Sequence, residues 1–303
     1  MNDADDQLKR CGHIAVIGAP NAGKSTLVNA LVGQKVAIVS PKAQTTRARL
    51  MGVAMHEHTQ MVLVDTPGIF APQRKLDRAM VSAAWDGAND ADLIMFIVDG
   101  RRGAGPKVTQ IAEALSGRSE PKWLILNKVD IARKDKLLEL ADKLNAITPF
   151  DAIYFVSALD GEGLNELKPI MAAAMPKGDW HFPEDQVSDA TDRAMAAEIT
   201  REQLYHRLHE ELPYAATVVT EKYTERENGS IEIHQQILVQ RPTQRGIVLG
   251  KGGQMIKAIG ETSRTELAEL LGVPVHLYLH VKVKADWDES AEIYEGIGLE
   301  WSG

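Results

Sequence analysis

Residues 18–25 have the sequence GAPNAGKS, which matches the phosphate-binding loop pattern G-x-x-x-x-G-K-[ST]. Gly18 and Gly23 allow the backbone to curl so that successive amide groups point at phosphate oxygens. Lys24 supplies a cation for the β- and γ-phosphates, and the Ser25 hydroxyl is a ligand for Mg²⁺. An apolar segment precedes the loop and an amphipathic segment follows it. The pattern predicts a nucleotide site between a strand and a helix. A chance match at an ordinary strand–helix turn is the alternative.

A second motif, DTPG at residues 65–68, follows the apolar run MVLV. An aspartate at the carboxyl end of a strand suits outer-sphere holding of Mg²⁺, which assigns this role to Asp65. The backbone amide of Gly68 can contact the γ-phosphate and sense its loss. A turn aspartate before a proline is the structural alternative for Asp65.

Two further motifs follow apolar strands: NKVD at residues 127–130 and SAL at residues 157–159. The Asp130 carboxylate can accept hydrogen bonds from N1–H and N2–H₂ of guanine, a pair of donors that adenine lacks. Asn127 can bond the base and the loop, and the aliphatic part of Lys128 can cover the ring. Backbone amides of residues 157–159 can meet guanine O6. A helix N-cap is the alternative role for Asp130.

The segments around these motifs alternate between strand and helix patterns, which predicts an α/β fold over residues 1–175. Strand patterns occupy residues 13–17, 49–55, 61–64, 93–98, 123–126 and 153–156, and helix patterns occupy 24–32, 108–115, 132–145 and 164–175. Apolar strands of this kind predict a mostly parallel sheet with helices on both faces. All four motifs follow such strands, and ligands bind at the carboxyl ends of parallel strands. We therefore expect one guanine nucleotide site.

Composition bounds the other function classes. The chain has 303 residues, 44% of them apolar and 25% charged, with a net charge of −8. Its single cysteine excludes a disulfide framework and a thiolate zinc site. The sequence has neither an apolar run long enough for a spanning helix nor the features of a signal peptide at its start. We expect a cytoplasmic protein, with peripheral contact to the inner face of the cell membrane left open.

The second half has a different pattern. Two prolines and four acidic residues between 176 and 190 predict a linker. Residues 191–303 then predict an α+β domain: a helix near 190–210, strands at 217–224 and 230–240, a helix at 254–271 and a strand at 275–283. Residues 239–284 contain seven Lys and Arg against three Asp and Glu, whereas both flanking segments are acidic. This basic segment points to an anionic partner.

The basic segment is centred on the sequence GKGG at residues 250–253. A G-x-x-G loop that opens a helix lets the main chain approach phosphates closely, and KH modules clamp about four nucleotides in this way. Lys251 and Lys257 add positive charge near the loop. Lys282 and Lys284 alternate with apolar residues on the last strand and share one face. A flexible turn is the alternative for the loop, and a solvated strand edge is the alternative for the two strand lysines.

The motifs GAPNAGKST and DTPG, followed by this G-x-x-G region, resemble the Era family of GTPases, with a type II KH domain over about 191–284. The resemblance implies a monomer that binds 16S ribosomal RNA near its 3′ end and acts in assembly of the 30S subunit. It implies that Gln44–Arg47 belong to a first switch loop, with a threonine contacting Mg²⁺. We assign this contact to Thr46, although the sequence gives no physical ground for choosing it over Thr45. The resemblance also implies that Asn21 supports a K⁺ ion. A turn residue after Pro20 is the alternative for Asn21.

The predicted sites divide into four sets. Catalytic roles are assigned to Lys24, Thr46 and Gly68, and Mg²⁺ contacts to Ser25, Thr46 and, through water, Asp65. Contacts to GTP or GDP are assigned to Gly18, Ala19, Pro20, Asn21, Ala22, Gly23, Lys24, Ser25, Thr26, Asp65, Thr66, Pro67, Gly68, Ile69, Asn127, Lys128, Val129, Asp130, Ser157, Ala158 and Leu159. RNA contacts are assigned to Gly250, Lys251, Gly252, Gly253, Lys257, Lys282 and Lys284.

The residue after the DTPG glycine is Ile69, where Ras-like enzymes have a glutamine that orients the attacking water. We therefore expect slow intrinsic hydrolysis, assisted by a cation or a partner. Arg47, Arg74 and Arg78 are candidates for an internal arginine finger. Other interpretations of the chain are a GTPase that acts on large-subunit RNA or in transfer-RNA modification, a P-loop phosphotransferase, and an RNA-binding scaffold with a structural nucleotide site.

Overall fold

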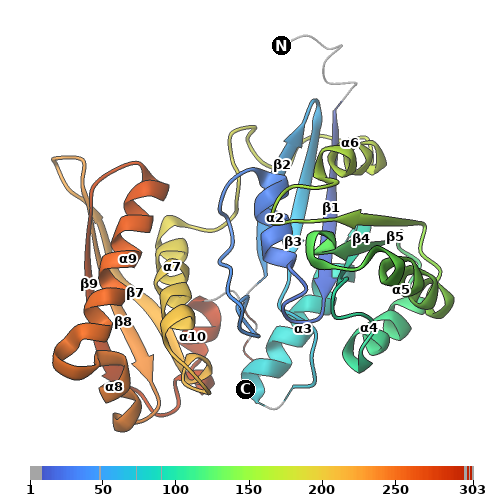
Figure 1. The fold of residues 1–303 in the computed structure, drawn as a ribbon. Helices are drawn as coiled ribbons and strands as arrows, with labels where there is room; N and C mark the ends of the chain where they lie inside the picture. The colour runs from blue at the N-terminus through green and yellow to red at the C-terminus, as the bar shows by residue number, and fades with distance from the viewer. Residues whose placement is uncertain are drawn as a thin grey trace. The chain divides into compact units, whose positions relative to one another are not determined.

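The computed structural model describes residues 9–47, 49–72, 74–89, 91–296, 299 and 301 of the chain. The chain divides into two compact units. The first comprises Met1–Ala37 and Thr46–Asp189, and the second comprises Ile38–Thr45 and Ala190–Gly303. The two units are described separately below (Figure 1).

The first unit contains a six-stranded sheet in the order β2-β3-β1-β4-β5-β6. Its strands are β1 (Arg10–Gly18), β2 (Leu50–His56), β3 (Thr59–Asp65), β4 (Leu93–Asp99), β5 (Lys122–Asn127) and β6 (Ala152–Val156). All neighbours pair in parallel except β2 and β3, which form an antiparallel hairpin. β3, β4 and the whole of β1 except its first residues are almost fully buried, as expected for strands covered on both faces.

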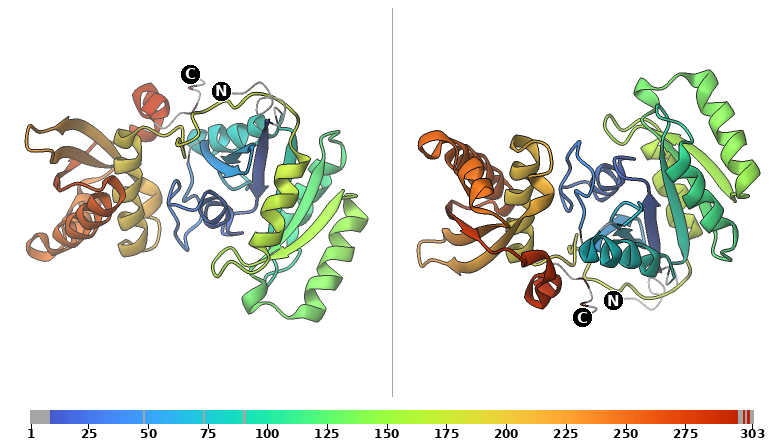
Figure 2. Two further views of the ribbon diagram at one scale, coloured as in Figure 1. Left: turned by 90° about the horizontal axis from the view of Figure 1, so that it is seen from above. Right: turned by 90° about the horizontal axis from the view of Figure 1, so that it is seen from below.

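Helices cover both faces of this sheet (Figure 2). They are α2 (Lys24–Val32), α3 (Lys75–Asn89), α4 (Pro106–Ser116), α5 (Lys134–Ile147) and α6 (Leu164–Ala174). α2 and α6 pack on one core, with Leu27, Leu31 and Met171 buried there. α3, α4 and α5 pack on the other core. The predicted α/β P-loop fold, with a mostly parallel sheet between two helical layers, is confirmed.

Helix α3 was not among the helices that the sequence patterns predicted. Its buried stripe consists of Leu76, Met80, Ala84 and Ala88, and small alanines form half of it. Alanine carries little hydrophobic signal, and it also occupies exposed positions of a helix, so the stripe is hard to recognise from periodicity alone. The helix becomes evident only when the sheet provides a surface for these small side chains.

The segment between 176 and 189 belongs to the first unit, although the sequence predicted a linker there. The Pro176 carbonyl accepts a hydrogen bond from the Cys11 amide at 3.1 Å, and the Val187 carbonyl accepts one from the Val53 amide at 2.8 Å. Gln60 contributes its amide group, which donates to the Phe182 carbonyl at 2.8 Å. The prolines and acidic residues thus indicate irregular structure here, as the sequence predicted. This irregular segment is bonded to strands of the sheet, and the boundary between the two units comes after it, at Asp189.

The second unit has a three-stranded sheet in the order β7-β8-β9, in which β7 and β8 are antiparallel and β8 and β9 are parallel. Its elements are α7 (Asp192–Arg207), β7 (Ala216–Glu225), β8 (Ile231–Val239), α8 (Pro242–Leu249), α9 (Gln254–Leu271), β9 (Val275–Val283) and α10 (Ala291–Gly296). The core packs α7 and α9 against one face of the sheet, with Leu204, Ile237 and Ile259 buried. The predicted KH architecture is confirmed. Within the described residues, no helix combines the length and apolar character needed to cross a membrane.

Candidate nucleotide site and RNA-binding loop

The phosphate-binding loop joins β1 to α2 and is tightly packed. Gly18 ends β1, and a Cβ atom added there would lie 2.4 Å from the Ile97 carbonyl oxygen. Gly23 is the N-cap of α2 with φ +95°, and a Cβ atom there would lie 2.2 Å from Nδ2 of Asn127. The loop therefore needs glycine at both positions for steric reasons. Its amides and the N-terminal end of α2 together form an anion site.

Three oxygen-bearing side chains converge beside this loop. Ser25 Oγ donates to Asp65 Oδ2 at 2.6 Å and lies 2.9 Å from Thr46 Oγ1. Thr46 Oγ1 also donates to the same carboxylate oxygen at 3.3 Å. The other oxygen, Oδ1 of Asp65, is buried and has no hydrogen-bond partner among the described residues. Two hydroxyls and a buried carboxylate are donors of the kind that Mg²⁺ prefers, so these residues fit that ion.

The two threonines of the switch loop lie in different surroundings. The Thr46 hydroxyl lies at Ser25 and Asp65, whereas the Thr45 hydroxyl bonds Ser40 Oγ at 2.6 Å and the Lys42 carbonyl at 2.8 Å. The sequence offered no physical reason to choose between them. The geometry favours Thr46 as the Mg²⁺ contact.

Lys24 is buried beneath the loop, where its Nζ donates to the Gly18 carbonyl at 3.3 Å and the Ala19 carbonyl at 3.4 Å. Burial lowers the pKa of Lys24 to about 8, opposed by the negative charge of Asp65. Burial likewise raises the pKa of Asp65, opposed by Lys24 and by hydrogen bonds from Ser25 and Thr46. Both charged groups are thus destabilised by desolvation, and a bound phosphate group would favour the cationic form of Lys24.

Asn127 connects three loops of the site. It is buried at the end of β5, and its Nδ2 donates to the Ala22 carbonyl at 2.9 Å. Its Oδ1 accepts from the amides of Lys128 at 2.8 Å and Ala158 at 3.0 Å. The side chain predicted to contact both base and loop thus holds the phosphate loop and the segment 157–159 together. Asp130 is exposed in the short 3₁₀ turn that follows.

Lys128 extends across the phosphate loop. Its backbone has φ +68°, and its Nζ donates to the Asn21 carbonyl at 2.7 Å and to Asp99 Oδ2 at 2.7 Å. Asp99, at the end of β4, also accepts from the amides of Arg101 and Arg102. Sequence reasoning missed Asp99, although an aspartate at the carboxyl end of the apolar run LIMFIV was the available signal.

The remaining predicted positions vary in exposure. Gly68 lies against the loop, since a Cβ atom there would be 2.9 Å from the Cα atom of Pro20. Ile69 is buried in the core beneath the sheet, so its side chain does not reach a reacting water. Ser157 and Ala158 are buried, whereas the Leu159 side chain is 83% exposed.

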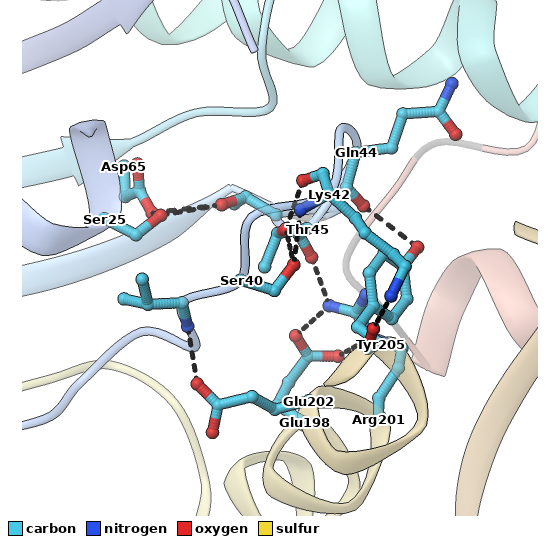
Figure 3. A network of polar contacts seen from close by, with 12 residues as sticks. Ser25, Ser40, Lys42, Gln44, Thr45, Asp65, Glu198, Arg201, Glu202 and Tyr205 are labelled. Atoms are coloured by element: carbon cyan, nitrogen blue, oxygen red, sulfur yellow. Dashed lines mark hydrogen bonds and ion pairs between the residues drawn. The ribbon is translucent and has the colours of Figure 1, made fainter. Parts of the chain in front are cut away.

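The switch segment is divided between the two units, and residues 38–45 belong to the second. Within that unit, Arg201 Nη2 donates to the Thr45 carbonyl at 2.5 Å and the Tyr205 hydroxyl donates to the Gln44 carbonyl at 3.2 Å (Figure 3). Glu202 Oε1 accepts from the Val39 amide at 2.7 Å. Sequence reasoning missed these α7 residues, because only tertiary structure brings them to a segment that lies about 160 positions earlier.

The same helix fixes the arginine that holds this segment. Arg201 is 1% exposed, and its guanidinium group forms a two-point ion pair with Glu198 on the preceding turn of α7. Lys42 also donates to the Tyr205 carbonyl. A buried, doubly bonded guanidinium group has a fixed orientation, so it can hold a backbone carbonyl in one place.

In the second unit, the G-x-x-G loop joins α8 to α9. Gly250 has φ +71°, and a Cβ atom there would lie 2.7 Å from Cβ of Met255, so this glycine is needed for the turn. Gly252 and Gly253 have φ +63° and +80°, and a Cβ atom at either would meet nothing within 4 Å. Their left-handed backbone favours glycine, and the space around them is open to a ligand.

A shallow groove of about 360 Å³ runs between α9 and β9. It is lined by Ile256, Lys257, Gly260, Glu261, Arg264, Leu277 and Leu279. Gly260 brings the helix close to the strand, because a Cβ atom there would already be 3.4 Å from Cδ1 of Leu279. The lining combines an apolar floor with the cations of Lys257 and Arg264 and the carboxylate of Glu261, which pairs with Lys257 at 3.8 Å. Apolar and cationic groups together suit bases and phosphates, and Arg264 is a member that sequence reasoning missed.

The predicted RNA-contacting lysines do not share one surface. Lys251 and Lys257 are exposed at the loop and groove. Lys282 is exposed on β9, on the alternate side from Leu277 and Leu279 that line the groove. Lys284 donates to Ser290 Oγ at 3.2 Å and pairs with Glu292 at 3.8 Å. The four lysines are therefore divided between different parts of this unit.

Comparisons with known proteins agree with both sites. Residues 13–128 match the family model described as a 50S ribosome-binding GTPase, and residues 211–288 match the KH domain model. The chain is 60% identical over 300 residues to GTPase Era of Erythrobacter litoralis, with 98% of this chain and 99% of the relative covered. The chain belongs to the Era family of GTPases. GTPase Era of Afipia carboxidovorans is 53% identical, with 96% and 95% of the two chains covered.

Solved Era structures are similar across both units. A variant of Aquifex aeolicus Era bound to GDP·AlF₄⁻ is 36% identical, with a TM-score of 0.90 and coverage of 95% of this chain and 99% of that one. Era in complex with MgGDPNP and nucleotides 1506–1542 of 16S ribosomal RNA is also 36% identical, with a TM-score of 0.90 and coverage of 96% and 99%. The expectation of an Era-family GTPase with a C-terminal KH domain is thus confirmed.

Proposed function

We propose that this Era-family GTPase is a GTP-operated switch that binds 16S ribosomal RNA near its 3′ end and acts in assembly of the 30S subunit. The observation that carries the proposal is the open G-x-x-G loop beside a groove that contains apolar residues and the cations Lys257 and Arg264, in a chain that also has a guanine nucleotide site. A solved relative binds MgGDPNP and nucleotides 1506–1542 of 16S ribosomal RNA. That similarity supports the same RNA class for this chain.

The experiment that tests the RNA assignment is crosslinking and sequencing of bound RNA in cells. Wild type is compared with Gly252→Asp, which places a carboxylate in the open loop, and with the isosteric neutral control Gly252→Asn. We expect crosslinks concentrated near the 3′ end of small-subunit RNA, lost with aspartate and retained with asparagine. Crosslinks to large-subunit or transfer RNA would instead support another RNA substrate, and scattered crosslinks would refute a specific RNA site at this loop.

At the nucleotide site, the loop amides and Lys24 would hold the phosphates, and Asp130 would select guanine. Ser25, Thr46 and Asp65 would hold Mg²⁺, which neutralises charge on the β- and γ-phosphates when it is bound. Gly68 lies against the loop with its amide available to sense the γ-phosphate. An assay with nucleotide alone, without an added acceptor, tests for hydrolysis, because a phosphotransferase would turn over only when the acceptor is supplied.

We infer slow intrinsic hydrolysis because Ile69 is buried and apolar, so it cannot orient the attacking water. Asn21, at φ +64° in the phosphate loop, is proposed to support a K⁺ ion that compensates for this absence. Turnover is measured with K⁺ and then with Na⁺ at equal ionic strength. Faster turnover in K⁺ is expected, and it should disappear in Asn21→Ala. Equal rates in the two salts would remove the K⁺ role.

We also infer that nucleotide state and RNA affinity are coupled through the switch segment. Thr46 lies at the Ser25–Asp65 pair, while its neighbour Thr45 is held through its carbonyl by Arg201 of the RNA-binding unit. One peptide bond thus separates a residue that GTP and Mg²⁺ would order from a residue fixed to α7. Linkage then requires that RNA alter nucleotide affinity by the same factor as nucleotide alters RNA affinity.

Tyr205→Phe tests this coupling with a small change, since it removes the hydroxyl that donates to Gln44. The ratio of RNA affinities in GTP and GDP is expected to change about threefold, the value of one hydrogen bond. Tyr223→Phe is a matched control, because its hydroxyl contacts Asp192 elsewhere in the same unit. An unchanged ratio in both variants would leave α7 without a role in coupling. RNA affinity that is equal in GTP and GDP for wild type would favour a passive scaffold.

The cellular setting is proposed rather than established by these sites. We infer a monomer that acts in the cytoplasm on the 30S subunit, and peripheral contact with the inner face of the cell membrane remains an expectation. Sedimentation of cell extracts at low and high salt separates these cases. Co-migration with small subunits supports the ribosomal assignment, and a salt-sensitive membrane fraction would support the peripheral contact.

A further inference from the structure

Strand β9 is an edge strand whose side chains face two different surfaces. Leu277 and Leu279 line the groove beside α9. The alternate residues His276, Tyr278 and His280 are exposed on the opposite face of the sheet. Because alternate side chains of one strand differ only in the face they occupy, the groove and this opposite face are separated by the thickness of a single strand.

The opposite face, which we call the open face, carries an aromatic platform. It carries the rings of His234 and Tyr278, the cations Lys222, Arg226 and Lys282, and the carboxylates Glu221 and Glu232. Tyr278 is 50% exposed and stacks on His234, with ring centroids 4.7 Å apart and an interplanar angle of 23°. The pair is aligned by strand register, since His234 lies opposite Tyr278 in the parallel β8–β9 ladder. A half-exposed ring held in place by a neighbouring ring is a surface on which a base can stack.

The open face carries three cations, Lys222, Arg226 and Lys282, against two carboxylates, Glu232 and Glu221, in a chain whose net charge is −8. Glu232 is held by Lys222 at 2.8 Å, by Arg226 and by His234 at 2.7 Å. These three groups lower the pKa of Glu232 to about 2, so it remains ionised and balances one of the cations. Glu221, at the β7 bulge, accepts a hydrogen bond from Gln236 and is the second carboxylate there. Lys282 adds a further cation at the end of β9.

We propose that the open face is a second RNA-binding surface, on which nucleotides flanking those in the G-x-x-G groove pass over the edge of β9 and stack on Tyr278. Lys282, Lys222 and Arg226 contact their phosphates. This inference rests on the proposed function and extends the RNA footprint to both faces of one sheet. Continuity with the groove and the aromatic platform favour RNA over an acidic protein, since aromatic side chains on a sheet are a common support for unstacked bases.

The test compares long and short RNA on the full chain. The long probe is RNA of nucleotides 1506–1542 of 16S ribosomal RNA, the segment bound by the solved relative. Nested truncations of it define the short probe, which is the smallest fragment that wild type binds and that Gly252→Asp binds more weakly. Tyr278→Ala is expected to weaken the long probe about 5- to 100-fold, the value of one base–aromatic stack, and to leave the short probe unchanged.

Matched variants separate the effects of the ring, of charge and of folding. Tyr278→Phe retains the ring and should bind the long probe as wild type does. Lys282→Glu should weaken only the long probe and reduce the salt dependence of binding by about one phosphate contact. Lys143→Glu, an exposed lysine of the first unit, is the charge control and should have no effect. Thermal unfolding midpoints of all variants check that the fold is retained.

Each outcome decides a different claim. Tyr278→Ala with wild-type affinity for both probes overturns the open face as an RNA surface, and pull-down with acidic protein would then be its alternative. Equal loss on both probes also overturns it, because the change would act through the groove. If Gly252→Asp binds every fragment as wild type does, the proposed groove is wrong, whatever Tyr278→Ala does.

Discussion

The chain contains two glycine-rich loops at the start of helices, and they use glycine for different reasons. In the phosphate-binding loop, side chains at Gly18 and Gly23 would collide with Ile97 and Asn127 at 2.4 and 2.2 Å. In the G-x-x-G loop, a Cβ atom at Gly252 or Gly253 would meet nothing within 4 Å. The first loop is closed by the protein around it, whereas the second has its open side toward solvent.

This difference indicates how each loop would recognise an anion. The first loop is held by Asn127 and Lys128, which bond the carbonyls of Ala22 and Asn21 at 2.9 and 2.7 Å. Such a loop is preorganised, which lowers the entropic cost of binding a small ligand of fixed shape. The second loop has only its left-handed glycines and the start of α9, which suits a chain of phosphates that can approach in more than one way.

The largest effect on ligand affinity is expected at Gly23, where the comparison of the two loops predicts that close packing requires glycine. Gly23→Ala would displace Asn127 and strain a residue at φ +95°. We expect GTP affinity to fall at least about 100-fold, since about 3 kcal/mol of strain and lost hydrogen bonds is involved. RNA affinity without nucleotide should stay unchanged. Titration with a fluorescent GTP analogue measures the loss, and near-normal affinity would refute the steric argument.

An intermediate effect on RNA affinity is expected at Gly252. A side chain has space there, so its charge determines the effect. Gly252→Asp should bind RNA about tenfold more weakly than Gly252→Asn, because a carboxylate near a phosphate costs about 1.4 kcal/mol at a surface. Both variants should keep the wild-type affinity for GTP and fold normally, since the position touches nothing. Fluorescence anisotropy with short RNA gives the ratio. Equal RNA affinity of the two variants would show that the loop does not face phosphate.

A smaller effect is expected from pH, and it separates the closed loop from the open one. Lys24 has a pKa of about 8 because it is buried, and bound phosphate favours its charged form. GTP binding near pH 8 should therefore take up about half a proton, and affinity should fall about fourfold between pH 7 and 8.5. Calorimetry in buffers of different ionisation enthalpy measures the uptake. Zero uptake would mean that Lys24 is already fully charged.

The smallest effect is expected at Gly33, which ends α2 with φ +90° and open space around it. It has the backbone of the other loops but no ligand to bind. Gly33→Ala should lower the free energy of unfolding by about 1 kcal/mol through backbone strain, with GTP and RNA affinities unchanged. Chemical denaturation gives the first value and the titrations above give the others. A loss of GTP affinity in Gly33→Ala would contradict the comparison, because a left-handed glycine without close packing would then also matter for GTP binding.

Much of the nucleotide site was predictable because its residues are local. Strand, glycine loop and helix are adjacent in sequence at residues 10–32, and each later motif directly follows an apolar strand. Asp99 obeys the same rule and was overlooked. The choice of Thr46 over Thr45 was different, because neighbouring threonines have the same chemistry and only their contacts with Ser25 and Ser40 distinguish them.

In the second unit, the sequence predicted the loop but not the surfaces around it. The alternation along β9 predicted one shared face for Lys282 and Lys284, but did not say which face borders α9. That depends on the side on which α9 packs, and so on long-range contacts such as Gly260 against Leu279. The stacking of His234 on Tyr278 similarly requires strand register, which a single strand does not specify.

The sequence by itself determined the family, the alternation of strands and helices around the motifs and the chemistry of both glycine loops, because these depend on residue types at short spacings. Only the tertiary structure decided that residues 38–45 are fixed by Arg201 and Tyr205, that α3 covers the sheet with alanines, and that residues 176–189 extend the first unit. The physical reason is that buried hydrogen bonds and side-chain packing join residues far apart in the chain. Local patterns carry no record of which distant partner will satisfy them.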